Sequence, residues 1–213
     1  MADRTRVKIC GIRDAETAWA ASDAGADAIG LVFVEKSPRY IDPEAAAEIL
    51  FNLPPMLTAV GLFQNHSLDA FLEIEAVCPT PMTQLHGSEP EKLVSQCGPG
   101  VIKSVRFDAA TIEGELTRWD AVGEVDAILV DGSAGGEGTA FDWTGLAEAI
   151  GRTGIGKPII LAGGLEPGNV GAAIRAVRPF AVDVSSGVER ERGVKDLGLI
   201  EAFCRAVRVA DAG

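Results

Sequence analysis

One pattern recurs along the whole chain and constrains its fold more than any other feature. A short apolar run rich in Val, Ile and Leu is followed by Gly, Pro or Asp and then by a segment rich in Ala, Leu and Glu. Such runs are typical of buried strands, and the segments between them are typical of helices. The expected strands span residues 7–10, 28–33, 58–63, 82–85, 101–105, 127–131, 158–162 and 180–185. The expected helices span residues 14–24, 43–52, 68–77, 90–97, 111–121, 143–150, 169–177 and 195–209.

Strict alternation of strands and helices predicts parallel strands joined by right-handed crossovers, in a sheet that is covered on both faces. Eight repeats in 213 residues suit a compact α/β fold, a single-domain (β/α)8 TIM barrel. No linker marks a second domain, so residues 1–213 are expected to form one barrel domain. An open doubly wound sheet would require a Gly-x-Gly-x-x-Gly turn after the first strand, whereas the chain reads Gly11-Ile12-Arg13-Asp14 there.

Composition narrows the class of protein further. With 47% hydrophobic and 23% charged residues, the chain can bury a substantial core. Its 19 Lys and Arg against 31 Asp and Glu give a net charge of −12, which argues against broad nucleic-acid binding. An anionic small ligand would therefore need a local positive site. No stretch approaches the roughly 18 apolar residues of a membrane span, and no signal peptide is recognisable, so no membrane partner and a cytoplasmic location are expected.

The potential metal ligands are scattered, with no Cys-x-x-Cys pair and no His-Glu-x-x-His helix. They are Cys10, Cys78, Cys97, Cys204, His66 and His86. Their spacing predicts neither a disulfide framework nor a metal site. Cys78, Cys97 and Cys204 fall in or beside expected helices and are interpreted as structural, and His66 as inert.

The first expected strand places two reactive side chains on one face. Side chains alternate along a strand, so Lys8 and Cys10 point into the barrel together. A buried Lys requires a carboxylate partner, for which Asp183 and Asp131 are the candidates. Cys10 is either a small buried hydrophobe or, with its thiolate stabilised by Lys8, a base or nucleophile at the mouth of the barrel.

Two acids occupy informative positions. Asp131 ends the sixth expected strand directly before the glycine-rich segment 132–138, where it is either a turn cap or a proton donor under a lid. Asp183 lies within an apolar strand, where an internal pair with Lys8 or Lys103 and a catalytic role are both open. Asp142 is expected to cap the helix that follows it.

The last two strand ends indicate a phosphate site. Loops after the seventh and eighth strands of such barrels recurrently bind phosphate, and small residues let main-chain N–H groups approach an anion. The candidate residues are Gly163, Gly164, Ser185, Ser186 and Gly187. A pair of glycine turns without a ligand is the alternative interpretation.

Two further candidate side chains follow strands at the same end of the expected barrel, which forms the rim of its mouth. Arg39, in a loop after the second strand, is either solvated or clamps a second anionic group such as a carboxylate. His86, after the fourth strand, is either a rim binding residue or a packed histidine.

Taken in order, these segments resemble the phosphoribosylanthranilate isomerase family. The resemblance is carried by Lys8-Ile9-Cys10-Gly11-Ile12, Gly25-Ala26-Asp27-Ala28-Ile29-Gly30, Ser37-Pro38-Arg39, Val60-Gly61-Leu62-Phe63, Gln84-Leu85-His86-Gly87, Phe141-Asp142-Trp143, Leu161-Ala162-Gly163-Gly164-Leu165 and Val182-Asp183-Val184-Ser185-Ser186-Gly187-Val188-Glu189. It implies a cofactor-free Amadori rearrangement of a small phosphorylated substrate in tryptophan biosynthesis.

The resemblance also implies roles for individual residues. Asp131 would be the general acid that opens the ribose ring, and Cys10 the general base that removes the C2 proton. Arg39 would hold the anthranilate carboxylate. His86, from its position at the rim, is a candidate substrate-binding residue. Asp183 would steer the ribose hydroxyls or the Schiff base, and the glycine and serine turns would hold the phosphate.

One segment departs from the family pattern. The loop after the acid is commonly longer there and carries a basic residue where this chain has Thr139. A histidine-pathway phosphoribosyl isomerase is an alternative, although those enzymes characteristically use Asp where this chain has Cys10. A catalytically silent sensor of phosphorylated ligands is another, and no apolar surface stripe predicts the oligomeric state.

Overall fold

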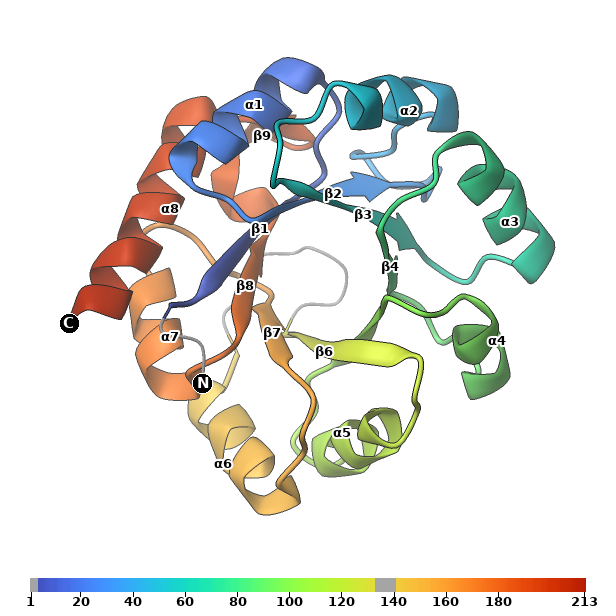
Figure 1. The fold of residues 1–213 in the computed structure, drawn as a ribbon. Helices are drawn as coiled ribbons and strands as arrows, with labels where there is room; N and C mark the ends of the chain where they lie inside the picture. Colours follow the sequence, from blue (N-terminus) through green and yellow to red (C-terminus); the bar gives the residue numbers. More distant parts are fainter. Residues whose placement is uncertain (1–3, 133–140) are drawn as a thin grey trace.

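The fold is a closed ring of eight parallel strands surrounded by helices (Figure 1). The computed structural model describes residues 4–132 and 141–213. The strands pair in chain order from β1 to β8, and β8 pairs with β1 to close the barrel, with Lys8 opposite Asp183. The predicted (β/α)8 TIM barrel is therefore confirmed.

The barrel strands are β1 Arg6–Cys10, β2 Ala28–Val32, β3 Thr58–Phe63, β4 Met82–Leu85, β5 Val101–Arg106, β6 Val125–Asp131, β7 Ile159–Ala162 and β8 Ala181–Val184. The α-helices are α1 Ala15–Ala24, α2 Pro43–Phe51, α3 Leu68–Val77, α4 Glu91–Gln96, α5 Ile112–Asp120, α6 Trp143–Thr153, α7 Val170–Val177 and α8 Leu197–Ala212. Among the described helices, none is both long enough and apolar enough to cross a bilayer.

The region after β8 differs from the sequence prediction. Residues 186–188 form a short 3-10 helix, η1 Ser186–Val188, and an antiparallel hairpin follows with strands β9 Glu189–Glu191 and β10 Val194–Lys195. The expected last helix began at Lys195, but this residue pairs with Glu189 across the hairpin. The helix begins two residues later because Asp196 accepts a hydrogen bond from the Leu199 N–H and caps it.

Side chains that alternate along the strands build two apolar layers. Outward residues pack against the helices in one large core, which includes Ile9, Leu31 and Ile128. Inward residues fill the barrel itself with a second cluster: Val60, Ile102, Ala127, Leu129, Ile160, Ala162 and Ala181. This inner cluster closes the barrel, so the polar side chains nearer the carboxyl ends of the strands form the floor and walls of any site there.

Several of the helices begin at a side-chain cap. Asp14, Asp42, Ser67 and Asp142 each accept a hydrogen bond from a main-chain N–H in the first turn of the helix that follows. An N-cap satisfies one of the N–H groups that a helix leaves unpaired. The predicted cap at Asp142 is confirmed, and the caps fix where each strand-to-helix loop ends.

Candidate active site

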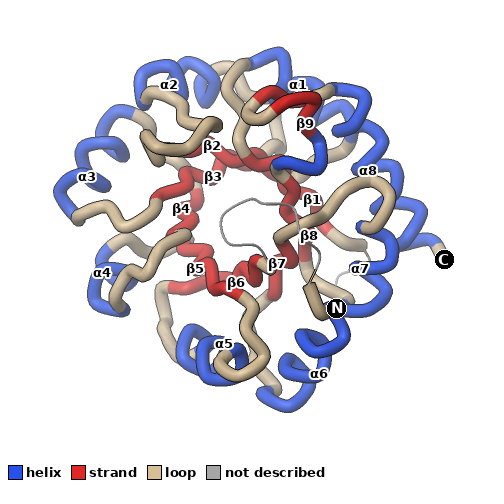
Figure 2. Tube along the Cα trace, turned by 180° about the vertical axis from the view of Figure 1, so that it is seen from behind, coloured by secondary structure: helices blue, strands red, loops and turns tan. Residues whose placement is uncertain are grey.

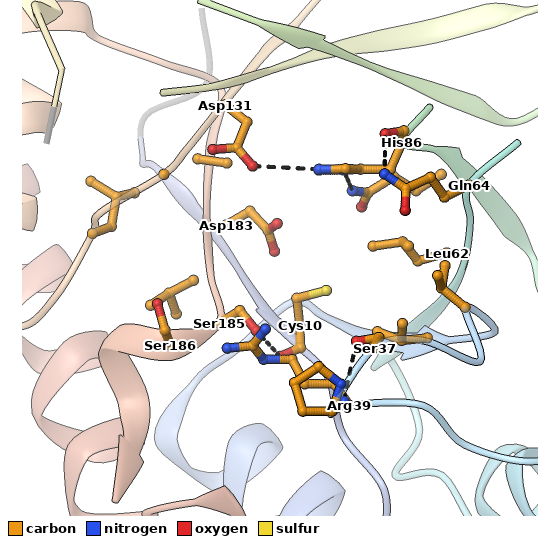
Figure 3. Close-up of a pocket in the computed structure, with 18 of the residues that line it drawn as sticks. Cys10, Ser37, Arg39, Leu62, Gln64, His86, Asp131, Asp183, Ser185 and Ser186 are labelled. Carbon is orange, nitrogen blue, oxygen red and sulfur yellow. Dashed lines mark hydrogen bonds and ion pairs between the residues drawn. The ribbon is translucent and has the colours of Figure 1, made fainter. Parts of the chain in front are cut away.

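A cavity of about 270 Å³ opens at the carboxyl ends of the strands (Figure 3). The structure brings nine of the ten predicted site residues to its wall: Cys10, Arg39, His86, Asp131, Gly163, Gly164, Asp183, Ser185 and Ser186. The tenth, Gly187, is absent from the described lining; a Cβ there would lie 1.9 Å from the Leu165 carbonyl oxygen. Gly187 therefore allows the loops after β7 and β8 to approach each other, just behind the cavity.

Lys8 forms its ion pair inside the barrel with Asp183. The Lys8 Nζ donates to Asp183 Oδ1 at 2.9 Å, and both side chains are buried. Of the two carboxylates predicted as partners, Asp183 is therefore the one that binds Lys8. Burial lowers the pKa of Lys8, but the attraction and hydrogen bonds of Asp183 and Cys10 together outweigh it and leave that pKa raised. The Lys8 ammonium stays charged beneath the cavity.

Gly30 on the neighbouring strand makes room for this pair and for the thiol. A Cβ at Gly30 would lie 2.8 Å from Cys10 Sγ and 3.2 Å from Lys8 Nζ. Real Cβ atoms do not approach sulfur so closely, so any side chain at this position would displace the thiol. The glycine in β2 thus leaves the space that Cys10 and Lys8 occupy.

The pKa of the Cys10 thiol corrects one expectation. Burial raises that pKa, and the positive charge of Lys8 lowers it, while Asp183 raises it and Lys195 lowers it. The sum is a raised pKa, so the expected stabilisation by Lys8 exists but does not outweigh burial. At neutral pH Cys10 is therefore a thiol.

Asp131 and His86 face each other across the next part of the wall. His86 Nε2 lies 3.4 Å from Asp131 Oδ2, while His86 Nδ1 lies 2.9 Å from the Gln84 amide nitrogen and 2.8 Å from Ser104 Oγ. An amide nitrogen only donates, so Nδ1 is an acceptor and the ring proton resides on Nε2, where the carboxylate also favours it. His86 is thus a rim residue that aims an N–H at Asp131, and neither Gln84 nor Ser104 was singled out in the sequence.

Arg39 reaches the cavity from the loop between β2 and α2. Its Nε and Nη2 donate to Glu189 Oε1 and Oε2 at 2.6 and 2.9 Å. The aliphatic part of Arg39 packs over Gly11, where a Cβ would lie 2.7 Å from Arg39 Cδ. Together with Lys36 and Arg192, Arg39 gives this rim three cations in a chain of net charge −12. This is the local positive site that an anionic ligand would require.

The loops after β7 and β8 form the opposite end of the cavity. Gly163 and Gly164 adopt φ of +90° and +65°, a conformation that favours glycine. A Cβ at Gly163 would also lie 2.6 Å from Asp131 Oδ1, so this glycine lets the acid sit against the turn. Asn169, which the sequence analysis did not identify, donates to the Gly164 carbonyl at 2.7 Å and accepts from the Glu166 N–H at 2.9 Å. These two hydrogen bonds fix the conformation of the turn from within the same loop.

Lys103 belongs to a different environment from the one considered in the sequence. It points outward from β5, and its Nζ donates to Glu89 Oε2 at 2.8 Å and to the carbonyls of Leu85, Gly87 and Ser104. The alternative pair between Asp183 and Lys103 is therefore excluded. A second cavity of about 750 Å³ adjoins the first on this side, and its lining includes His86, Asp131 and Lys103.

The remaining sequence candidates lie away from the cavity. The rings of His66 and Phe63 lie edge to face, with their centroids 5.5 Å apart. Cys78, Cys97 and Cys204 are buried, and burial raises the pKa of each thiol to about 11. Among the described residues, no three metal-binding side chains lie close enough to hold an ion. The proposed lid, residues 132–138, lies outside the described residues from Ser133 onward, as does Thr139.

Comparisons with known proteins agree on one family. The family model described as N-(5'phosphoribosyl)anthranilate (PRA) isomerase matches residues 7–206. The N-(5'-phosphoribosyl)anthranilate isomerase of Moorella thermoacetica is 49% identical over 211 residues, covering 97% of this chain and 91% of that protein. The protein of the same name from Hahella chejuensis is 46% identical over 205 residues, covering 94% of this chain and 92% of that protein.

Solved structures give the same result. The crystal structure of phosphoribosyl anthranilate isomerase from Thermotoga maritima is 40% identical, with a TM-score of 0.86, and covers 96% of this chain and 99% of that one. A structure of phosphoribosyl anthranilate isomerase in complex with reduced 1-(o-carboxyphenylamino)-1-deoxyribulose 5-phosphate is 38% identical, with a TM-score of 0.83 and the same coverage.

Proposed function

Because the chain belongs to the N-(5'-phosphoribosyl)anthranilate isomerase family, we propose how its own residues divide the work of that reaction. The protein is an isomerase of tryptophan biosynthesis that acts on a small phosphorylated substrate. It converts N-(5-phosphoribosyl)anthranilate into 1-(2-carboxyphenylamino)-1-deoxy-D-ribulose 5-phosphate, an Amadori rearrangement in which no atom is gained or lost.

One observation supports the proposed roles above all others: a thiol and a carboxylate from non-neighbouring strands line the same cavity. Cys10 ends β1 and Asp131 ends β6, and Asp183 lies between them in Figure 3. The reaction needs one group that gives a proton and another that removes one from a different atom of the substrate. Cys10 and Asp131 supply these two groups without a cofactor.

We assign the first step to Asp131 as general acid. It gives a proton to the ribose ring oxygen, the bond between C1 and that oxygen breaks, and the nitrogen lone pair forms a Schiff base with C1. The His86 N–H that faces the carboxylate orients Asp131 and stabilises its charge once the proton has left.

The second step belongs to Cys10 as general base. Its thiolate takes the proton from C2, and the electrons of that C–H bond form a C1–C2 double bond while the Schiff base nitrogen becomes neutral. The resulting enolamine takes a proton at C1 and gives up the proton of its C2 hydroxyl, and the C1–C2 double bond is replaced by the C2=O bond of the ketone. Since burial favours the thiol form of Cys10, Lys8 and Lys195 are the charges that favour its thiolate in this step.

Binding is divided between the two ends of the cavity. Arg39 holds the anthranilate carboxylate, and the turns at Gly163-Gly164 and Ser185-Ser186 present main-chain N–H groups to the phosphate, with Gly187 packed behind them. Asp183 and His86 contact the ribose between these two anchors. No nucleic-acid partner is proposed. The four free cysteines support a reducing compartment, and we place the protein in the cytoplasm.

The test follows loss of anthranilate-adduct fluorescence, with the substrate generated in situ and a chelator present. Cys10→Ser and Asp131→Asn should each reduce kcat by at least about 10²-fold while product affinity stays within about tenfold. Asp126→Asn is the matched control, because Asp126 lies on the same strand but is exposed. Near wild-type turnover in either variant would remove the role assigned to that residue, and no turnover by the wild type, with product still bound, would favour a sensor.

A further inference from the structure

Glu189 is a buried acid that no step above uses. It begins the β9–β10 hairpin, and its side chain is only 4% exposed. Its two carboxylate oxygens accept four hydrogen bonds: from Arg39 Nε at 2.6 Å, Arg39 Nη2 at 2.9 Å, Lys195 Nζ at 2.9 Å and the Gly193 N–H at 3.1 Å. A buried carboxylate with this many donors is fixed in place.

The hairpin itself is docked on the loop that carries Arg39. Glu189 and Lys195 are partners across the hairpin, and β9 lies at the rim of the barrel beside α1 (Figure 2). At the turn, Gly193 has φ of +84°, and a Cβ there would lie 2.4 Å from the Pro38 carbonyl oxygen. This close approach means that Glu189 meets Arg39 from a rigid support and not from a loose loop.

The pairing leaves one edge of the guanidinium available. Glu189 occupies Nε and Nη2, and within the described residues Nη1 of Arg39 has no hydrogen-bond partner. Two cations, Arg39 and Lys195, share one carboxylate, so the group of three carries one uncompensated positive charge at the cavity wall. A carboxylate on the ligand would neutralise that charge.

The protonation state of Glu189 suits this arrangement. Burial raises its pKa, but the hydrogen bonds from Arg39 and Lys195 outweigh burial and lower it to about 2. Glu189 is therefore ionised throughout the pH range in which an enzyme of this kind works.

We propose that Glu189 is a positioning residue that gives Arg39 its selectivity for a substrate carrying a carboxylate on the aromatic ring. The inference rests on the binding role proposed for Arg39. By occupying one edge of the guanidinium, Glu189 turns the Nη1 edge toward the ring carboxylate and holds it there before the substrate arrives. The substrate then gains a charge-assisted contact without having to order a long side chain.

The test compares two substrates, the phosphoribosyl adducts of anthranilate and of aniline, which lacks the carboxylate. The quantity measured is the ratio of kcat/KM for the anthranilate adduct to kcat/KM for the aniline adduct. Glu189→Gln should lower this ratio by about tenfold or more, mainly through a higher KM for the anthranilate adduct. Damage to the structure in general would lower both values together and leave their ratio unchanged.

Matched variants separate the possible outcomes. Glu191→Gln makes the same chemical change at an exposed position of the same strand and should leave the ratio within about twofold. Arg39→Met should abolish most of the preference, and adding Glu189→Gln to it should lower the ratio no further, because Glu189 acts through Arg39.

Failure of this inference is distinct from failure of the proposed function. If Arg39→Met lowers the ratio but Glu189→Gln leaves or raises it, Glu189 does not position Arg39 and the inference is overturned. If the ratio survives Arg39→Met, the carboxylate role of Arg39 is wrong, and if the wild type turns over neither adduct, the proposed function is wrong. Should Glu189→Gln not fold, Glu189→Asp keeps the charge on a shorter side chain, and an unchanged ratio in that variant would also overturn the inference.

Discussion

Two of the buried Lys–carboxylate pairs, Lys8–Asp183 and Lys103–Glu89, involve barrel strands, and they differ in what surrounds them. Lys8 and Asp183 meet inside the strand ring, beside Cys10 and directly beneath the cavity. Lys103 and Glu89 meet outside the ring, where the ammonium group has four oxygen acceptors, three of them main-chain carbonyls. The inner pair adjoins reactive groups, whereas the outer pair binds main chain.

The difference shows that a buried charge by itself does not mark a site. Lys103 donates to the carbonyls of Leu85 and Gly87, on either side of His86, and Glu89 accepts from the N–H groups of Gly87 and Asn65. The outer pair therefore fixes two loops. Burial lowers the pKa of Lys103, whereas the pKa of Lys8 is raised. The two lysines differ in the face of the strand on which they lie, since Lys8 points into the barrel and Lys103 points out toward the helices.

The largest effect should come from breaking the inner pair. Lys8→Met leaves Asp183 buried without its cation and removes the charge that most favours the Cys10 thiolate, so kcat/KM should fall by at least about 10²-fold. Because Lys8 lowers the pKa of Cys10, the rising limb of kcat against pH should also move to higher pH. Steady-state kinetics across pH measures both, and a variant with near wild-type turnover and an unmoved limb would place Lys8 in the same structural class as Lys103.

Breaking the outer pair should instead lower stability. Lys103→Met leaves Glu89 buried and unpaired, which costs about 3–5 kcal/mol. For a chain of this size that corresponds to a fall in Tm of about 6–20 °C, whereas kcat of the folded variant should change by less than about tenfold. Thermal unfolding and kinetics at 25 °C test this together, and adding Glu89→Gln should recover part of the lost stability. A fall in kcat of more than about tenfold, with a fall in Tm of less than about 6 °C, would remove the contrast between the two pairs.

Lowering the pH tests how much the ionised form of Glu189 contributes to stability. Its pKa is about 2 in the fold against an ordinary value of 4.5, so its ionised form stabilises the fold fully above about pH 4.5, and this contribution is lost as pH falls toward 2. The difference in free energy of unfolding between wild type and Glu189→Gln should be constant near neutral pH and shrink below about pH 4.5. Urea unfolding at a series of pH values measures it, and a difference that grows on acidification would contradict the ion-paired state.

The smallest effect should come from a pair in solvent. Glu201 and Arg205 form an exposed pair one turn apart on α8. Glu201→Gln removes the same charge as a change at Glu89 or Glu189 but should move Tm by no more than about 2 °C, because exposed pairs contribute little. A larger shift would mean that charge removal in general destabilises this acidic chain, and the buried pairs would have to be compared against that baseline.

The sequence predicted the fold because its signals were local and repeated. Each strand is a short apolar run, and caps such as Asp14 and Asp142 stand where their helices begin. The hairpin after β8 escaped prediction because β10 has only two residues, and Lys195 read as the start of a helix. Its strands are held by a side-chain pair and by contact with another loop, which no local pattern encodes.

The residues that line the cavity were largely predictable from the sequence, whereas their partners and protonation states were less so. Strand alternation places Lys8 and Cys10 on one face, and the strand-end position of Asp131 follows from its segment alone. The partner of Arg39 cannot be predicted from local sequence, because Glu189 is 150 residues away in the chain. The raised pKa of Cys10 was missed for a similar reason, since burial is a sum over every neighbour, whereas the proximity of Lys8 can be read from two positions.

The absence of a side chain at Gly30 matters for any attempt to build this site into another barrel. The position of the thiol is set by a missing Cβ on the next strand, so copying Cys10 and Lys8 alone onto another barrel would not reproduce the site. The acceptor scaffold would also have to supply an empty volume at the register position opposite the cysteine. A list of the proposed proton-transfer residues omits Gly30, although the position of the Cys10 thiol depends on the space that this glycine leaves.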